Sequence, residues 1–170
     1  MSLFIVNTLP VEEETVRDRI AQLTDGFSDY KVIHTAQLTI KPCIGCNACW
    51  LITPGICSIK DDYDKLLRAY LQYDTIVFLA GTALGFVNHQ MKNVIDRILP
   101  LVTMYVKIQD GEIRHTLRYE KEYRFGLLYA GEADKDYLND WMERVALNFG
   151  GKSIGVYPLE MCEEIKPCIL

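Results

Sequence analysis

The chain has 170 residues, of which 49% are hydrophobic and 24% charged, so it is long enough to bury a core of its own and we expect a single domain over residues 1–170. Its formal net charge of −5 provides no basic surface for nucleic acid or an anionic membrane, and we expect neither as a partner. The apolar runs are too short to span a bilayer, and the first ten residues lack the pattern of a secretory signal. We therefore expect a cytoplasmic location.

Strands and helices alternate along the sequence. Short apolar runs predict five strands, at residues 3–7, 30–34, 75–80, 123–129 and 153–157. Apolar residues at helical spacing predict four helices between them, at about residues 12–23, 61–71, 89–103 and 135–149. The run at 75–80 is wholly apolar, which is typical of a strand buried on both faces of a parallel sheet. The pattern predicts an α/β fold with a doubly wound, five-stranded parallel sheet in the order 2-1-3-4-5.

Two further features concern the connections between these elements. Asp110-Gly111 lies between two apolar runs and predicts a small hairpin, inserted near residues 105–118. Residues 81–88 are interpreted as a turn. Ligands of doubly wound sheets bind outside the carboxyl ends of the strands, so we expect a binding site in the loops at residues 7–14, 81–88 and 130–135.

Four cysteines are concentrated in an irregular, proline- and glycine-containing loop at residues 40–58. Cys43, Cys46, Cys49 and Cys57 follow the pattern C-x2-C-x2-C-x7-C, which suits ligation of a [4Fe–4S] cluster. Unligated thiols are a second interpretation. Zinc is a third, because structural zinc sites usually draw their ligands from two separated cysteine pairs. The two cysteines of the C-terminal tail are expected to be free or simply buried.

The cysteine loop also carries a family resemblance. Ile40-Lys-Pro-Cys-Ile-Gly-Cys-Asn-Ala-Cys49, followed by Gly55-Ile-Cys57 and Ile59-Lys-Asp-Asp62, resembles the cysteine segment of iron–sulfur flavoproteins and related NADPH-dependent FMN reductases. The resemblance continues in residues 74–79 and 91–97. It implies a flavodoxin-like fold, FMN bound at the carboxyl ends of the strands, NAD(P)H as reductant, and a homodimer that passes electrons to a redox partner or a small-molecule acceptor.

The same resemblance implies a set of cofactor-binding residues in three loops. They are Thr8, Thr15, Gly81, Thr82, Ala83, Leu84, Gly85, Phe86, Tyr129 and Gly131.

The first of these loops departs from the family pattern. In the family it is rich in Ser, Gly, Arg and Thr, whose N–H and hydroxyl groups cradle the FMN phosphate. Here residues 7–15 read Asn-Thr-Leu-Pro-Val-Glu-Glu-Glu-Thr, and three carboxylates at the start of a helix repel a phosphate dianion. The Ser-Pro-x-Tyr stretch that the family offers to the flavin ring is replaced by Ala-Gly-Thr-Ala at residues 80–83.

These observations favour a flavin (FMN)-dependent NAD(P)H oxidoreductase or electron-transfer flavoprotein, with a [4Fe–4S] cluster on the cysteine loop as a further expectation. The cofactors would supply the chemistry, so we expect no catalytic side chain. One alternative is a family member that has lost FMN and acts as a non-catalytic or cluster-only partner subunit, and another is a zinc-stabilised binding module. The neighbouring Asp96 and Arg97 are expected to be structural, bonding to a loop or to a partner chain.

Overall fold

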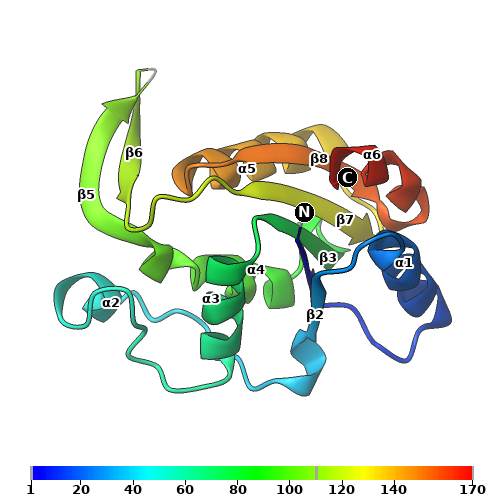
Figure 1. The fold of residues 1–170 in the computed structure, drawn as a ribbon, viewed down its shortest axis with the longest axis horizontal. Helices are drawn as coiled ribbons and strands as arrows, with labels where there is room; N and C mark the ends of the chain where they lie inside the picture. Colours follow the sequence, from blue (N-terminus) through cyan, green and yellow to red (C-terminus); the bar gives the residue numbers. More distant parts are fainter. Residues whose placement is uncertain (1, 110, 170) are drawn as a thin grey trace.

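The computed structural model describes residues 2–109 and 111–169. Its central sheet has parallel strands in the order β2-β1-β3-β7-β8, which confirms the predicted order 2-1-3-4-5 (Figure 1). The strands are β1 (Leu3–Asn7), β2 (Tyr30–His34), β3 (Thr75–Ala83), β7 (Arg124–Ala130) and β8 (Lys152–Pro158). β1 lies at the point where the order reverses, because Leu3 is in register with Tyr30 on one side and with Thr75 on the other.

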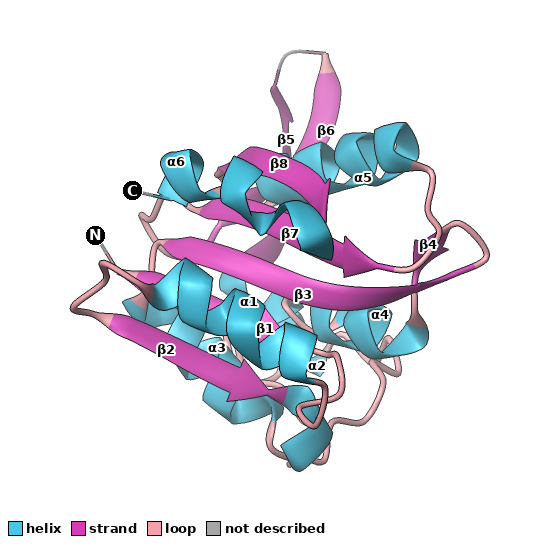
Figure 2. Cartoon of the chain, turned by 90° about the vertical axis from the view of Figure 1, so that its right-hand side faces the viewer, coloured by secondary structure: helices cyan, strands magenta, loops and turns pink. Residues whose placement is uncertain are grey.

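Helices cover both faces of this sheet (Figures 1 and 2). One face carries α3 (Tyr63–Gln72), α4 (His89–Asp96) and α5 (Lys135–Asn148). The other carries α1 (Glu14–Thr24) together with the C-terminal η3 (Leu159–Glu164) and α6 (Lys166–Ile169). The C-terminal tail therefore closes the hydrophobic core on the α1 face, a role that the sequence did not predict.

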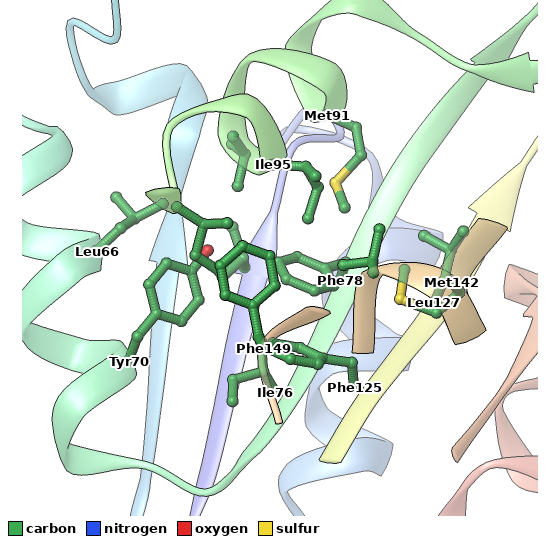
Figure 3. Packing of buried hydrophobic residues seen from close by; sticks show 14 of the residues in the cluster. Leu66, Tyr70, Ile76, Phe78, Met91, Ile95, Phe125, Leu127, Met142 and Phe149 are labelled. Atoms are coloured by element: carbon green, nitrogen blue, oxygen red, sulfur yellow. The ribbon is translucent and has the colours of Figure 1, made fainter. Parts of the chain in front are cut away.

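The side chains of β3 explain its wholly apolar sequence. Ile76 and Phe78 pack into the core under α3, α4 and α5, whereas Val77 and Leu79 pack into the core under α1. Successive residues of a strand point to opposite faces, so a strand covered on both faces needs apolar residues at every position. Figure 3 shows the first of these cores, in which the rings of Phe78 and Phe125 are stacked with their centroids 5.9 Å apart.

The predicted hairpin is present and projects from the domain (Figure 1). It consists of β5 (Val102–Gln109) and β6 (Glu112–Leu117), paired antiparallel. Ile108 lies opposite Ile113, and both side chains are exposed.

The predicted helix over residues 89–103 is wrong in its second half. α4 ends at Asp96, a short 3-10 helix η2 (Leu99–Leu101) follows, and β5 begins at Val102. Pro100 explains the end, since proline has no N–H for an α-helical hydrogen bond and restricts the residue before it.

The predicted turn at residues 81–88 is wrong as well, because the strand does not end at Ala80. β3 continues to Ala83 and pairs antiparallel with β4 (Phe86–Val87). Leu84 and Gly85 have φ of 53° and 79°, the left-handed values that a two-residue hairpin loop requires.

Two short helical segments lie in and before the cysteine loop. A single 3-10 turn η1 (Thr35–Gln37) precedes the loop, and α2 (Ala48–Leu51) lies within it. Among the described residues, none of the helices combines the length and the apolar character needed to cross a membrane.

Candidate functional site

The predicted site residues fall into two groups at opposite ends of α4. The loops at the carboxyl ends of β1, β3 and β7 form the first group, and Asn88 at the start of α4 belongs to it, because its N–H donates to the Gly81 carbonyl (2.9 Å). The cysteine segment forms the second group, next to Arg97 directly after α4. An eight-residue helix is about 12 Å long, which sets the scale of the separation between the two groups.

The first loop is fastened to β3 and to itself. Thr8 donates both its N–H and its hydroxyl to the Leu79 carbonyl, each at 2.9 Å. Asn7 Oδ1 accepts the N–H of Leu9 at 3.0 Å, and Asn7 Nδ2 donates to the Leu9 carbonyl at 3.1 Å. Thr15 is exposed in the first turn of α1. The structure thus places Thr8 at the expected edge with its hydroxyl hydrogen already used.

The second and third loops contact one another. The Thr82 hydroxyl donates to the Ala130 carbonyl (3.2 Å), and the Asp134 N–H donates to the Gly85 carbonyl (3.1 Å). A Cβ on Gly131 would lie 2.5 Å from Thr82 Oγ1, so this position requires glycine for space as well as for its φ of 106°. The structure therefore brings the predicted residues 81–86 and 131 together, with Ala83 and Leu84 exposed at the hairpin tip.

The two aromatic candidates are engaged in packing. Tyr129 is only 7% exposed and belongs to the core. The ring of Phe86 lies 4.9 Å from that of Trp141 and 5.4 Å from that of Tyr137, both on α5. Whether either ring contacts a flavin stays a prediction.

The four thiols of the cysteine segment lie near one another but do not form a closed metal centre. Cys43 and Cys46 are exposed, whereas Cys49 and Cys57 are half-buried. Burial raises the pKa of Cys49, and the neighbouring charges of the other three thiolates act in the same direction. Within residues 2–109 and 111–169, no three Cys, His, Asp or Glu side chains are grouped closely enough to hold a metal ion. The four thiols have the donor chemistry of a cluster site, but they are not grouped closely enough to hold one.

Arg97 is the cation around which this segment is organised. Its side chain is 1% exposed and forms an ion pair with Asp61, whose side chain is 2% exposed. The guanidinium also donates to the Lys41 carbonyl (3.0 Å) and to the Cys57 sulfur (3.4 Å). It lies over the ring of Tyr63, 4.6 Å from the centroid. The structure thus confirms that Arg97 bonds to a loop, and the loop is the cysteine segment.

Asp61 and Asp62 hold the start of the same segment. Asp61 accepts the N–H of Lys41 and Asp62 accepts the N–H of Thr39, each at 2.9 Å. Burial acts to raise the pKa of Asp61, but the hydrogen bond from Arg97 and those from backbone N–H groups outweigh it, so the pKa of this carboxyl is lowered. Asp61 is therefore a carboxylate at neutral pH.

A cavity of about 520 Å³ opens beside Cys57. Its lining combines cations, carboxylates and apolar side chains from the end of the cysteine segment, from α3 and from Arg97. The lining residues are Ile56, Cys57, Ile59, Lys60, Asp61, Asp64, Leu67, Arg68 and Arg97. Cys57 is thus reachable from solvent on one side while it contacts a buried cation on the other.

In the metal-free protein we expect Cys46 to be alkylated faster than Cys49 at neutral pH, by about fivefold or more. The Ser58 hydroxyl, 3.3 Å from the Cys46 sulfur, and the Ala48 N–H lower the pKa of Cys46, whereas burial raises that of Cys49. Peptide mapping by mass spectrometry after timed exposure to iodoacetamide measures both rates. In a Ser58→Ala variant only the Cys46 rate should fall, and equal rates in the wild-type chain would contradict the expectation.

Sequence reasoning missed the ion pair of Arg97 with Asp61. The neighbouring Asp96 pairs instead with Lys92, one helical turn earlier. The local sequence contains no signal for the pairing of Arg97, since its partner lies 36 positions away.

Comparison with curated proteins connects the chain to two iron–sulfur flavoproteins. It is 42% identical over 100 residues to an iron–sulfur flavoprotein of Archaeoglobus fulgidus, a match that covers 57% of this chain and 48% of that protein. It is 33% identical over 86 residues to an iron–sulfur flavoprotein of Methanocaldococcus jannaschii, covering 51% of this chain and 44% of that protein. The matches thus span less than half the length of these relatives. No protein-family model matches the sequence.

Solved structures confirm the fold class. The chain superimposes on an NAD(P)H:quinone oxidoreductase from Methanothermobacter marburgensis with a TM-score of 0.64 at 14% identity, covering 99% of this chain and 96% of that one. An FMN-dependent NADH-azoreductase from Bacillus anthracis, solved in complex with FMN, gives a TM-score of 0.60 at 11% identity, with coverages of 99% and 96%. The resemblance expected from the cysteine segment is confirmed, and the fold is flavodoxin-like.

Proposed function

We propose that the chain is a flavin-dependent oxidoreductase or electron-transfer protein that takes electrons from NAD(P)H. The observation that carries the proposal is the 42% identity over 100 residues to a protein named an iron–sulfur flavoprotein. The fold supports it, because a chain of the same architecture is named an FMN-dependent NADH-azoreductase. A bound flavin would supply the hydride and electron chemistry, and the protein would supply position and environment.

The loops after β3 and β7 are the part of the site that suits a flavin ring. Gly85 and Gly131 lie in the loops that follow β3 and β7, the region where ligands of this architecture bind. Thr82 and Asn88 hold these loops to their neighbours through the hydrogen bonds described above. We propose that residues 81–86 and 131 present a rigid backbone edge to the ring.

The cluster is the finer part of the proposal. Cys43, Cys46, Cys49 and Cys57 have the donor chemistry of iron–sulfur ligands, and Arg97 contacts one of them. Ligation would require these thiols to lie closer together than they do among the residues that the structure describes. The expected homodimer, redox partner, cytoplasmic location and domain organisation also stay predictions.

The experiment that tests the function is a visible absorption spectrum of the anaerobically purified chain, with flavin, iron and zinc quantified on the same sample. We expect bound or readily reconstituted flavin, and oxidation of NADH or NADPH that depends on it. Saturating flavin should raise the melting temperature, because a ligand at 100 times its Kd stabilises the native state by about 2.7 kcal/mol. A colourless protein whose melting temperature ignores added flavin would contradict the proposal.

That contradicting result would favour the second candidate, a partner subunit without flavin. One structural observation supports this candidate: the N–H groups of Thr8 and Leu9, which lie in the loop expected to bind the phosphate, are used within the protein. Metal analysis separates its cluster-only form from the zinc module, since iron without zinc excludes the latter.

A further inference from the structure

The end of β1 is where a doubly wound sheet normally holds the phosphate of a nucleotide. The loop N–H groups and the positive end of the following helix point at the anion there. In this chain the loop is residues 8–13 and the helix is α1. Three independent features of this loop bear on whether it can hold a phosphate.

The first feature is that the donors of Thr8 and Leu9 are already used. The Thr8 N–H and hydroxyl both donate to the Leu79 carbonyl, and the Leu9 N–H donates to Asn7 Oδ1. Pro10, the next residue, has no N–H to offer. A phosphate would have to break the connection between β1 and β3 to reach these groups.

The second feature is that the space is filled. Leu9 is 5% exposed and packs in the core on the α1 face. Its Cδ2 atom lies 3.6 Å from the position that a Cβ on Gly81 would occupy. The side chain therefore packs beside Gly81, near the carboxyl end of β3.

The third feature is the charge at the start of the helix. Glu12, Glu13 and Glu14 are all exposed, and Glu13 is the residue that precedes the first turn of α1. Carboxylates there interact favourably with the helix dipole, which otherwise attracts an anionic ligand. A phosphate at this position would meet three like charges.

We infer that the first loop is a closed structural turn that does not hold the 5′-phosphate of a flavin, so that FMN binds this chain no more tightly than riboflavin. The inference rests on the proposed flavin function. The inference concerns the hydrogen bonds and packing of residues 7–10. The charge of the three glutamates is a separate effect, which substitution with glutamine removes.

The test compares the dissociation constants of riboflavin and FMN for the full chain by quenching of flavin fluorescence. We expect the constant for FMN to be no more than about threefold lower than that for riboflavin, well under the 1.4 kcal/mol that a tenfold preference represents. The Glu12→Gln, Glu13→Gln, Glu14→Gln triple variant should still show no preference for FMN. A tenfold preference for FMN in the wild-type chain overturns the inference. A preference that appears only in the triple variant also overturns it, because charge and not the closed turn would then be what rejects phosphate.

Failure of the function and failure of the inference are distinguishable. If neither flavin binds, the proposed function and flavin recognition by this chain both fail, and the closed turn is tested by itself with inorganic phosphate. Backbone amide resonances of residues 8–16 should then stay in place in tens of millimolar phosphate, with the Thr8 and Leu9 amides protected from exchange. Saturable shifts of these resonances would overturn the closed turn.

Discussion

Replacing Arg97 with methionine is expected to lower the free energy of unfolding by roughly 3–5 kcal/mol, because it leaves a buried carboxylate without its counter-ion. The Asp61 side chain is 2% exposed, and its ion pair with Arg97 lies beneath the cysteine segment. Urea denaturation of the full chain measures the change as a lower midpoint at constant slope.

Lys92→Met is the matched control, since it removes a cation of the same region. Lys92 pairs with Asp96, but both side chains are more than 40% exposed. The loss should therefore stay within about 0.5 kcal/mol. Arg97→Lys keeps the charge without the planar fork and should recover only part of the stability. A loss below 1 kcal/mol in Arg97→Met would show that the ion pair does not hold the segment.

Hydrogen exchange at individual amides separates the local role of Arg97 in the cysteine segment from a general loss of stability. Arg97 and Asp61 together fix the Lys41 backbone, through its carbonyl and its N–H. In Arg97→Met, hydrogen exchange should therefore accelerate at the Lys41 amide under conditions where the β3 amides remain protected. This result would show that Arg97 holds the segment in place at Lys41 and Cys57.

The sheet could be predicted from the sequence because its determinants are local. A wholly apolar run at residues 75–80 between two helical patterns requires a strand covered on both faces. The strand order follows from the general rules for connections between parallel strands. The predicted ends of β3 and of α4 were wrong. The observed ends depend on a two-residue hairpin loop at Leu84 and Gly85 and on the proline at position 100.

The candidate site could be predicted in composition but not in contacts. The spacing of the cysteines identified the segment, and the glutamates at residues 12–14 identified the first loop as unusual. Arg97 pairs with Asp61, 36 positions away, and Thr8 pairs with Leu79, 71 positions away. Such pairings depend on the folded arrangement, and no periodicity in the sequence encodes them.

Gly151→Ala is expected to lower the free energy of unfolding by about 3 kcal/mol or more, which is the second large effect. A Cβ at Gly151 would lie 2.7 Å from the carbonyl carbon of Tyr123 and closer still to its oxygen. That oxygen accepts the Lys152 N–H at 2.9 Å, the hydrogen bond at the start of the pairing between β7 and β8. Both partners in the clash are backbone, so neither can rotate away and the edge of the sheet must shift.

Gly126→Ala is the matched control for this clash. The three atoms nearest to a Cβ there belong to the side chains of Ile165 and Ile154, which can change rotamer, so the loss should be roughly 1–2 kcal/mol. Thermal and urea unfolding of both variants measure the difference. Equal losses of stability in the two variants would mean that the short distance from Gly151 to the Tyr123 carbonyl is not the reason that this position needs glycine. A clearly larger loss for Gly151→Ala would show that the glycine after α5 sets how closely β8 joins the sheet, the edge from which the C-terminal tail crosses to cover the α1 face.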